Sequence, residues 1–158
     1  MLRITSEWIA GLTMTVAGLF SILLMSGCSS VSTIEASMHA DKALNPDING
    51  RPSPLVVRLY ELKSLSVFNT ADFFNLFEQD VALLGDELQM RDEFAFQPGE
   101  SKSLERDLRI DTRYLGILGA YRDIENARWR NSVEVEPGED LELIIEFGAK
   151  GIDIRKDD

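Results

Sequence analysis

The fold is decided by the stretch Leu141-Glu142-Leu143-Ile144-Ile145-Glu146-Phe147, close to the C-terminus. Its side chains at positions 141, 143, 145 and 147 are all apolar, whereas Glu142 and Glu146 lie between them. Successive side chains of a strand point to opposite faces. The alternation therefore predicts a strand with one face in a core and the other in water.

The same period of two recurs along most of the chain and is interrupted by turn residues at intervals typical of an all-β sandwich. The residues from Tyr114 to Tyr121 are apolar on both faces, which indicates a strand in the middle of its sheet. We predict eight strands, at residues 31–40, 54–62, 88–97, 101–108, 114–122, 129–135, 140–148 and 151–155.

Two turns share one chemistry, Gln97-Pro98-Gly99-Glu100 and Glu136-Pro137-Gly138-Glu139. Proline presets φ at the second turn position and glycine accepts a positive φ at the third. We expect each turn to join neighbouring strands. In the strand at 88–97, Leu88, Met90, Phe94 and Phe96 share a face, and Asp92 interrupts that row, so it is a candidate for a bulge or a strand end.

One segment follows a helical period instead. Apolar residues recur at helical spacing from Phe73 to Leu84, Asn69 or Thr70 could serve as the N-cap, and Gly85 follows as a stop. We predict a helix or a pair of helices inserted between the second and third strands. The apolar stripe, which includes Val81, could bind a partner, but packing against the domain itself is favoured.

The N-terminal segment has the layout of a lipoprotein signal peptide. Arg3 precedes an uncharged apolar run that ends in Met25-Ser26-Gly27-Cys28. We expect cleavage of residues 1–27, acylation of Cys28, a short tether over 28–33 and a single domain over 34–158. An uncleaved membrane helix is the alternative, because the run approaches the roughly 20 residues that span a bilayer. Ser29 in place of an aspartate favours the outer membrane.

Composition excludes several function classes. The formal net charge is −11, which disfavours nucleic acid as a partner and gives no attraction to anionic lipids. Attachment to the outer membrane should therefore rest on the acyl chains. Since Cys28 is the only cysteine, the mature domain has no internal disulfide.

No catalytic motif is present. His39 is the single histidine, and neither a phosphate-binding glycine loop nor a nucleophile elbow occurs. The neighbouring carboxylates at 92–93, 123–125 and 139–140 are expected by composition to be solvated. We expect no enzyme activity, no metal, no cofactor beyond the covalent lipid and no small-molecule substrate.

The one locally basic stretch contains Arg122, Arg128, Trp129 and Arg130. Arginine and tryptophan are enriched at interfaces. We favour the alternative in which Trp129 points inward, while Arg128 and Arg130 pair with acidic side chains on the opposite face.

The connection from Asp41 to Pro54 is the candidate binding site. It is longer than most strand connections, and loops of this length tend to be functional or disordered. Its prolines restrain it, so we expect a shaped, partner-binding loop. The candidate contact residues are Asn45, Pro46, Asp47, Asn49, Gly50, Arg51 and Pro52.

Short segments in a constant order resemble the TssJ lipoproteins of the type VI secretion system. They comprise the Cys28 motif, Asn45-Pro46-Asp47, Gly50-Arg51-Pro52-Ser53-Pro54, Val56-Val57-Arg58-Leu59-Tyr60-Glu61-Leu62, Ala71-Asp72-Phe73-Phe74, Asp92-Glu93-Phe94, Pro98-Gly99-Glu100, Tyr114-Leu115-Gly116, Tyr121-Arg122-Asp123 and Trp129-Arg130. No single segment is specific, but the set covers the mature chain.

The resemblance implies a transthyretin-like two-sheet sandwich on the periplasmic face of the outer membrane. It also implies binding of the periplasmic C-terminal domain of TssM, and of TssL indirectly, with the loop at 41–54 as the TssM-binding element. Other readings are a secretin pilot or an enzyme inhibitor that shares only the signal and the sandwich, and a small-ligand carrier or hydrolase, which would need a closed pocket.

Overall fold

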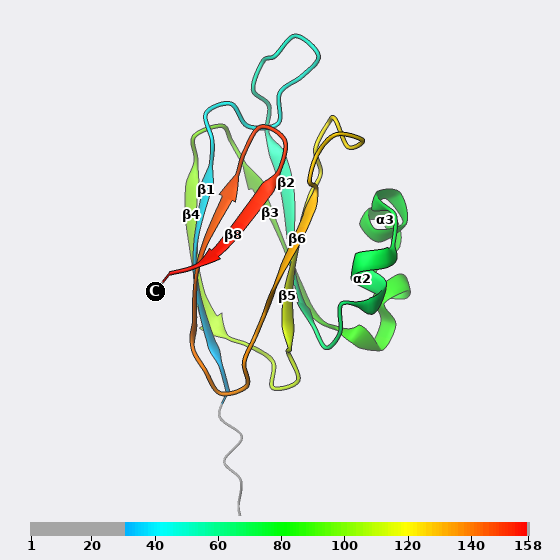
Figure 1. Ribbon diagram of the computed structural model, residues 1–158, viewed down its shortest axis with the longest axis vertical. Coiled ribbons are helices and arrows are strands. Elements are labelled where there is room, and N and C mark those ends of the chain that lie inside the picture. Colours follow the sequence, from blue (N-terminus) through cyan, green and yellow to red (C-terminus); the bar gives the residue numbers. More distant parts are fainter. Residues whose placement is uncertain (1–30, 158) are drawn as a thin grey trace, which may run out of the picture.

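The computed structural model describes residues 31–157 and contains two four-stranded sheets that pack face to face, with helices on one side (Figure 1). The strand order is β4-β1-β7-β8 in one sheet and β3-β2-β5-β6 in the other. The elements are β1 (Thr33–Ala40), β2 (Leu55–Leu62), α2 (Ser66–Thr70), α3 (Phe73–Leu84), the 3-10 helix η1 (Gly85–Glu87), β3 (Leu88–Phe96), β4 (Ser101–Asp107), β5 (Tyr114–Gly119), β6 (Arg130–Glu134), β7 (Leu141–Phe147) and β8 (Ile152–Lys156).

The predicted all-β sandwich, with its helical insertion between the second and third strands, is confirmed. In β7, Leu141, Leu143, Ile145 and Phe147 are buried, while Glu142 and Glu146 are exposed. β7 runs parallel to β1 and antiparallel to β8, so it is an inner strand of its sheet. The expected signal peptide and Cys28 lie outside the described residues.

Two apolar cores hold the layers together. The larger lies between the sheets, where the rings of Phe96 and Phe147 approach to 4.8 Å between centroids. The smaller lies between the helices and the outer face of the second sheet, around Tyr60, Phe68 and Leu118. Both faces of β5 are therefore covered, as predicted for a central strand.

β5 is shorter than predicted because the chain turns at its end. The strand stops at Gly119, and Tyr121 N–H donates to the Gly119 carbonyl at 3.0 Å. The Tyr121 side chain then turns inward and joins the core between the sheets.

The two proline-glycine turns form as predicted but connect different layers. Gly99 has φ of 80° and Gly138 has φ of 82°, and each turn closes with a backbone hydrogen bond from its fourth to its first residue. The first turn leads from β3 to β4 and the second from β6 to β7, so each crosses from one sheet to the other. Neither joins strands that are hydrogen-bonded neighbours.

We expected the irregularity in β3 at Asp92, but it lies elsewhere in the strand. Asp92 pairs in register with Leu59, and the register shifts between Glu61 and Leu62, where the pairing skips Gln89. An extra residue in one strand reverses the side-chain alternation beyond it. Leu88 consequently packs on the helical side of the sheet, whereas Phe94 and Phe96 face the other sheet.

The helical insertion begins differently from the prediction. Asp72, rather than Asn69 or Thr70, caps α3, and its carboxylate accepts from Asn75 N–H at 3.1 Å. The predicted stop at Gly85 is confirmed, with φ of 50°. The stripe packs against the domain except at Val81, whose side chain is 62% exposed. Within residues 31–157, no helix is long and apolar enough to cross a membrane.

Candidate functional site

Three connections meet at the end of the sandwich opposite the start of β1 (Figure 1). They are the β1–β2 loop at 41–54, the β5–β6 loop at 120–129 and the β7–β8 turn at 148–151. Backbone hydrogen bonds join them, since Asp41 N–H donates to the Phe147 carbonyl and Arg128 N–H donates to the Lys150 carbonyl, both at 2.9 Å. The candidate loop therefore belongs to a composite surface.

The base of the β1–β2 loop is built into the domain. Leu44 is fully buried, and Ser53 N–H donates to its carbonyl at 2.9 Å. Asn45 is 3% exposed and has a positive φ of 44°, a conformation that asparagine tolerates better than most residues. Its Nδ2 donates to the Pro54 carbonyl at 2.7 Å, and its Oδ1 accepts from Arg122 N–H at 2.8 Å. Asn45 thus fastens the loop to the neighbouring connection.

The tip of the loop is organised around one carboxylate. Asp47 Oδ1 accepts from the N–H groups of Asn49 at 2.8 Å and Arg51 at 3.0 Å, and Oδ2 accepts from Arg51 Nε at 2.7 Å. Hydrogen bonds from the Arg51 side chain and backbone hold the pKa of the Asp47 carboxyl below its usual value. Gly50 completes the turn with φ of 76°. Residues 47–51 therefore form a closed, shaped tip.

Ile48 stands out at this tip because its side chain is 100% exposed. It follows Asp47, whose carboxylate closes the turn around it. Our list of candidate residues omitted it. Ile48 is the one aliphatic residue among the proline, glycine, asparagine and charged residues of 45–52, and this pattern could have identified it.

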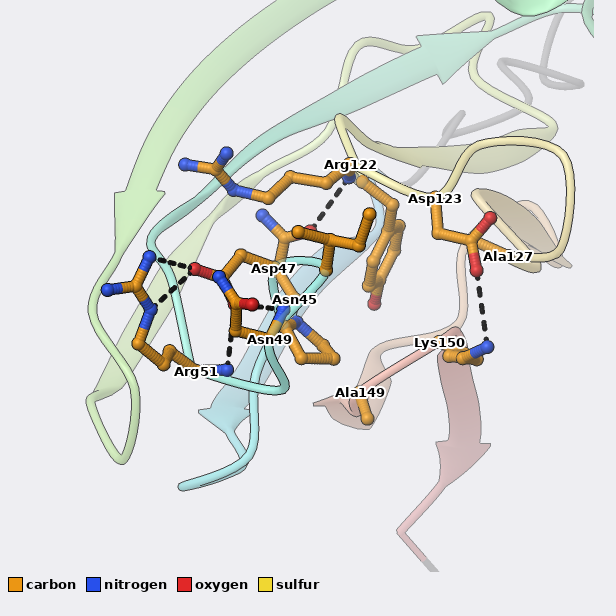
Figure 2. Close-up of a pocket in the computed structure, with 12 residues that line it drawn as sticks. Asn45, Asp47, Asn49, Arg51, Arg122, Asp123, Ala127, Ala149 and Lys150 are labelled. Atoms are coloured by element: carbon orange, nitrogen blue, oxygen red, sulfur yellow. Dashed lines mark hydrogen bonds and ion pairs between the residues drawn. The ribbon is translucent and has the colours of Figure 1, made fainter.

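A hollow of about 740 Å³ lies between the β1–β2 loop and the other two connections. Figure 2 shows its lining, which includes Asn45, Asp47, Arg122, Asp123 and Lys150. Asp123 pairs with Lys150 at 3.2 Å across the rim, and Arg122 is exposed beside the tip. The hollow is open, and its charges of both signs suit a protein surface better than an enclosed small ligand.

The basic stretch leads into β6, which begins at Arg130, and its side chains contact different parts of the domain. Arg128 pairs with Asp153, as predicted. Trp129 is half-buried and contacts both cores, and the Arg130 guanidinium lies over its ring at 4.6 Å. Arg130 does not pair with an acid, because its Nη1 donates to the carbonyls of Phe68 at 2.9 Å and Ala71 at 2.7 Å. It thereby satisfies the C-terminal carbonyls of α2, which have no partner within the helix.

The remaining polar groups do not converge on a reaction centre. His39 is exposed, with Nδ1 at 2.9 Å from Ser101 Oγ. Among residues 31–157, no group of three or more histidine, cysteine, aspartate or glutamate side chains is placed to hold a metal ion.

Comparison with known proteins identifies the chain. The family model of type VI secretion lipoproteins (T6SS-SciN; VasD, EvfM, TssJ) matches residues 32–150. The chain belongs to this family. The match covers the helices, every strand except β8, and the composite surface as far as Lys150, and the resemblance to TssJ is confirmed.

Solved structures agree with this assignment to the TssJ family. The T6SS lipoprotein TssJ1 from Pseudomonas aeruginosa is 38% identical, with a TM-score of 0.79 over 81% of this chain and 98% of that one. Serratia marcescens Lip, a membrane-bound component of the type VI secretion system, is 28% identical, with a TM-score of 0.72 over 79% and 98%.

A more distant likeness shows the fold alone. The structure of the C-terminal domain of the T6SS protein TssM from EAEC contains a chain that is 24% identical, with a TM-score of 0.63 over 80% of this chain and 98% of that one. No curated protein matches the sequence.

Proposed function

We propose that this TssJ-family protein is a structural lipoprotein, anchored by acylated Cys28 to the periplasmic face of the outer membrane, that binds the periplasmic C-terminal domain of TssM. TssL would join the same envelope complex indirectly, through TssM. One observation carries the proposal. The shaped tip at 47–51 lies at the end of the sandwich opposite the start of β1, the strand that follows Cys28 in the sequence (Figure 1).

The chain length places the two ends in different surroundings. Val31 is three positions after Cys28, and an extended chain spans at most about 3.5 Å per residue, so the domain begins within roughly 10 Å of the acylated residue. The eight residues of β1 add about 26 Å at ~3.3 Å each. The anchor would hold one end against the outer membrane, and the β1–β2 loop would project into the periplasm, toward an inner-membrane partner.

The loop residues divide into two roles in this proposal. Asn45 and Asp47 shape the loop, because their side-chain oxygens are occupied by hydrogen bonds within the domain. The contacts with TssM would come from residues at the tip and on its flanks. The exposed ones are Ile48, Asn49, Gly50, Arg51 and Pro52, and Pro46 is half-buried.

Substitution of Ile48 tests the loop directly. We expect Ile48→Asp to weaken binding to the purified TssM periplasmic domain by about 30-fold, because an anchor side chain at an interface contributes roughly 2 kcal/mol. The change should leave the fold intact, since Ile48 makes no buried contact. Isothermal titration calorimetry measures the affinity. Deleting the whole segment 43–50 is a poorer test, because it would also remove the buried Leu44 and Asn45.

Ile110 provides the matched control. It is 55% exposed and lies in the β4–β5 connection, at the opposite end of the sandwich. Ile110→Asp makes the same chemical change and should bind TssM like the parent. Equal affinities for the two variants would remove the β1–β2 loop from the interface. The other assignments are tested by pull-down from a detergent-solubilised envelope, where a secretin or a target enzyme would replace TssM.

A further inference from the structure

The connection between β4 and β5 displays an apolar residue at the end of the domain where β1 begins (Figure 1). Residues 109–112 form a turn that Thr112 N–H closes by donating to the Arg109 carbonyl at 2.9 Å. Ile110 occupies the second position of this turn and is 55% exposed. An exposed aliphatic residue on its own requires no explanation, but the support beneath this one is unusual.

That support is a carboxylate inside the sandwich. Glu61 is fully buried, and its Oε2 accepts from Arg109 N–H at 2.8 Å and from Thr112 Oγ1 at 2.9 Å. A buried carboxylate is costly unless it is paired and hydrogen-bonded, so these two bonds hold the turn in one shape. Ile110 is presented on a rigid turn whose inner side is fixed to the core.

A second exposed apolar residue lies beside this turn. Leu108 N–H donates to the Ser32 carbonyl at 2.8 Å, which brings the start of the turn against the start of the domain. Val31 precedes Ser32 and is 47% exposed. The two aliphatic side chains therefore lie at the end of the sandwich where Val31 is only three positions from Cys28 in the sequence.

We propose that Val31 and Ile110 form a membrane-contacting face that dips into the headgroup region of the bilayer and fixes the orientation of the domain on it. This inference rests on the proposed acylation of Cys28. Apolar side chains at the headgroup boundary are stabilised in proportion to the area that they remove from water. A short tether also makes the contact effectively intramolecular, so a contact too weak to bind a free protein is sufficient.

Charges of both signs surround this contact. Arg109 is exposed beside Ile110, but Asp111 pairs with Lys63 at 3.2 Å, and the neighbouring β6–β7 turn contributes Glu136, Glu139 and Asp140. These carboxylates would be repelled by anionic lipid. The occupant that fits is therefore a bilayer surface met through apolar side chains, and the probe for it is a zwitterionic phosphatidylcholine vesicle.

The single cysteine makes a clean test available. Because Cys28 is the only cysteine and would be consumed by acylation, an introduced cysteine is the only free thiol. The acylated Ile110→Cys protein is labelled with the environment-sensitive fluorophore NBD and reconstituted into phosphatidylcholine vesicles, with and without doxyl-labelled lipid. Ile48→Cys, at the opposite end of the sandwich, is the matched control and is labelled in the same way.

We expect the probe at position 110 to shift its emission to the blue and to be quenched by doxyl lipid several-fold more strongly than the probe at position 48. Equal, weak quenching at both positions in protein that sediments with the vesicles would overturn the membrane-contacting face and leave the anchor intact. A blue shift without doxyl quenching would indicate burial against protein and would also overturn it. Protein that fails to sediment with vesicles would instead refute the acylation of Cys28, and this inference with it.

Discussion

At the scale of single residues, Arg106 forms an ionic cluster with two carboxylates, one of which is fully buried. Its Nη2 lies 2.8 Å from Glu61 Oε1, and its Nη1 lies 2.8 Å from Asp92 Oδ2, so one guanidinium on β4 joins two carboxylates on β2 and β3 across the sandwich. These contacts are close, but neither ion pair has hydrogen-bond alignment, and Glu61 is fully buried. The cluster therefore depends on charge compensation.

Removal of the Arg106 guanidinium should destabilise the folded state strongly. We predict that Arg106→Met lowers the free energy of unfolding by about 3–5 kcal/mol, because the change leaves Glu61 charged and unpaired in the interior. Urea denaturation followed by tryptophan fluorescence measures the loss. Arg106→Met combined with Glu61→Gln should be more stable than Arg106→Met alone, since a glutamine oxygen can still accept from Arg109 N–H and Thr112. A double variant no more stable than the single one would contradict this explanation.

The candidate loop shows what residue chemistry can and cannot predict. The Asn-Pro-Asp and Asn-Gly pairs favour a shaped turn through local hydrogen bonds, and local chemistry is visible in the sequence. The burial of Asn45 depends on the Arg122 N–H, 77 positions along the chain. No local pattern indicates that Asn45, rather than Asn49, is the turn asparagine that faces the domain.

At the scale of elements, α3 is joined to the second sheet by a buried acid as well as by its apolar face. Asp80 is 4% exposed, and its Oδ2 accepts from Arg91 Nη1 at 2.9 Å, from Tyr60 Oη at 3.0 Å and from Arg58 Nη1 at 3.1 Å. Arg58 Nη1 also donates to the Phe77 carbonyl, and the helix leaves helical geometry at Gln79, with φ of −130°. The kink therefore coincides with the point where Arg58 engages the helix.

This attachment should depend on pH. Burial opposes ionisation of Asp80, but hydrogen bonds from Arg91 and Tyr60 outweigh it and hold the pKa of the Asp80 carboxyl below its usual value. A group whose pKa is lower in the folded state contributes stability above its unfolded pKa, about 3.9 for aspartate, and loses it as the pH falls through the folded pKa. The contribution is therefore present at neutral pH and lost in acid.

We predict that Asp80→Asn lowers the free energy of unfolding by about 3 kcal/mol at pH 7, because the arginines lose their buried counter-charge. The difference between parent and variant should shrink as the pH falls below about 4. Urea titrations at a series of pH values follow it. Glu78→Gln removes an exposed acid from the same helix and should stay within about 0.5 kcal/mol of the parent. A loss for Asp80→Asn that does not vary with pH would rule out the ionic attachment.

Elements that bury one face were predicted from their period, and those shaped by long-range contacts were not. The alternation of apolar and charged residues was enough to predict β7, because a sandwich buries every second side chain of such a strand. Leu88 lies on the helical face of the sheet because the register of β3 shifts by one residue against β2, and the sequence of β3 itself does not indicate this shift. The predicted caps of α3, Asn69 and Thr70, belong to the separate helix α2, and Asp72, which was not among the predicted caps, caps α3.

At the scale of the whole molecule, the long axis of the sandwich separates the proposed anchor from the proposed partner. Successive strands run alternately up and down the long axis. The connections that follow β1, β3, β5 and β7, at 41–54, 97–100, 120–129 and 148–151, therefore lie at the same end (Figure 1). The end at which β1 begins holds the connections at 108–113 and 135–140 and the start of the helical insertion at Lys63. A rigid domain of this form can transmit force between a lipid at one end and a protein at the other.

That arrangement makes Cys28 the point on which the proposed function depends. We predict that Cys28→Ala moves the protein from the outer-membrane fraction to the soluble periplasmic or inner-membrane fraction, because the domain carries a net charge of −11 and has no polybasic face to bind lipid. Sucrose-gradient fractionation of cell envelopes checks the location. The isolated variant domain should still bind TssM, since the change lies at the opposite end from the loop, whereas type VI secretion in cells should be lost. Cys28→Ala protein that remained in the outer membrane would contradict lipid anchoring. Ile48→Asp supplies the complementary phenotype, with normal fractionation and weakened TssM binding, so the two variants separate attachment at one end from recognition at the other.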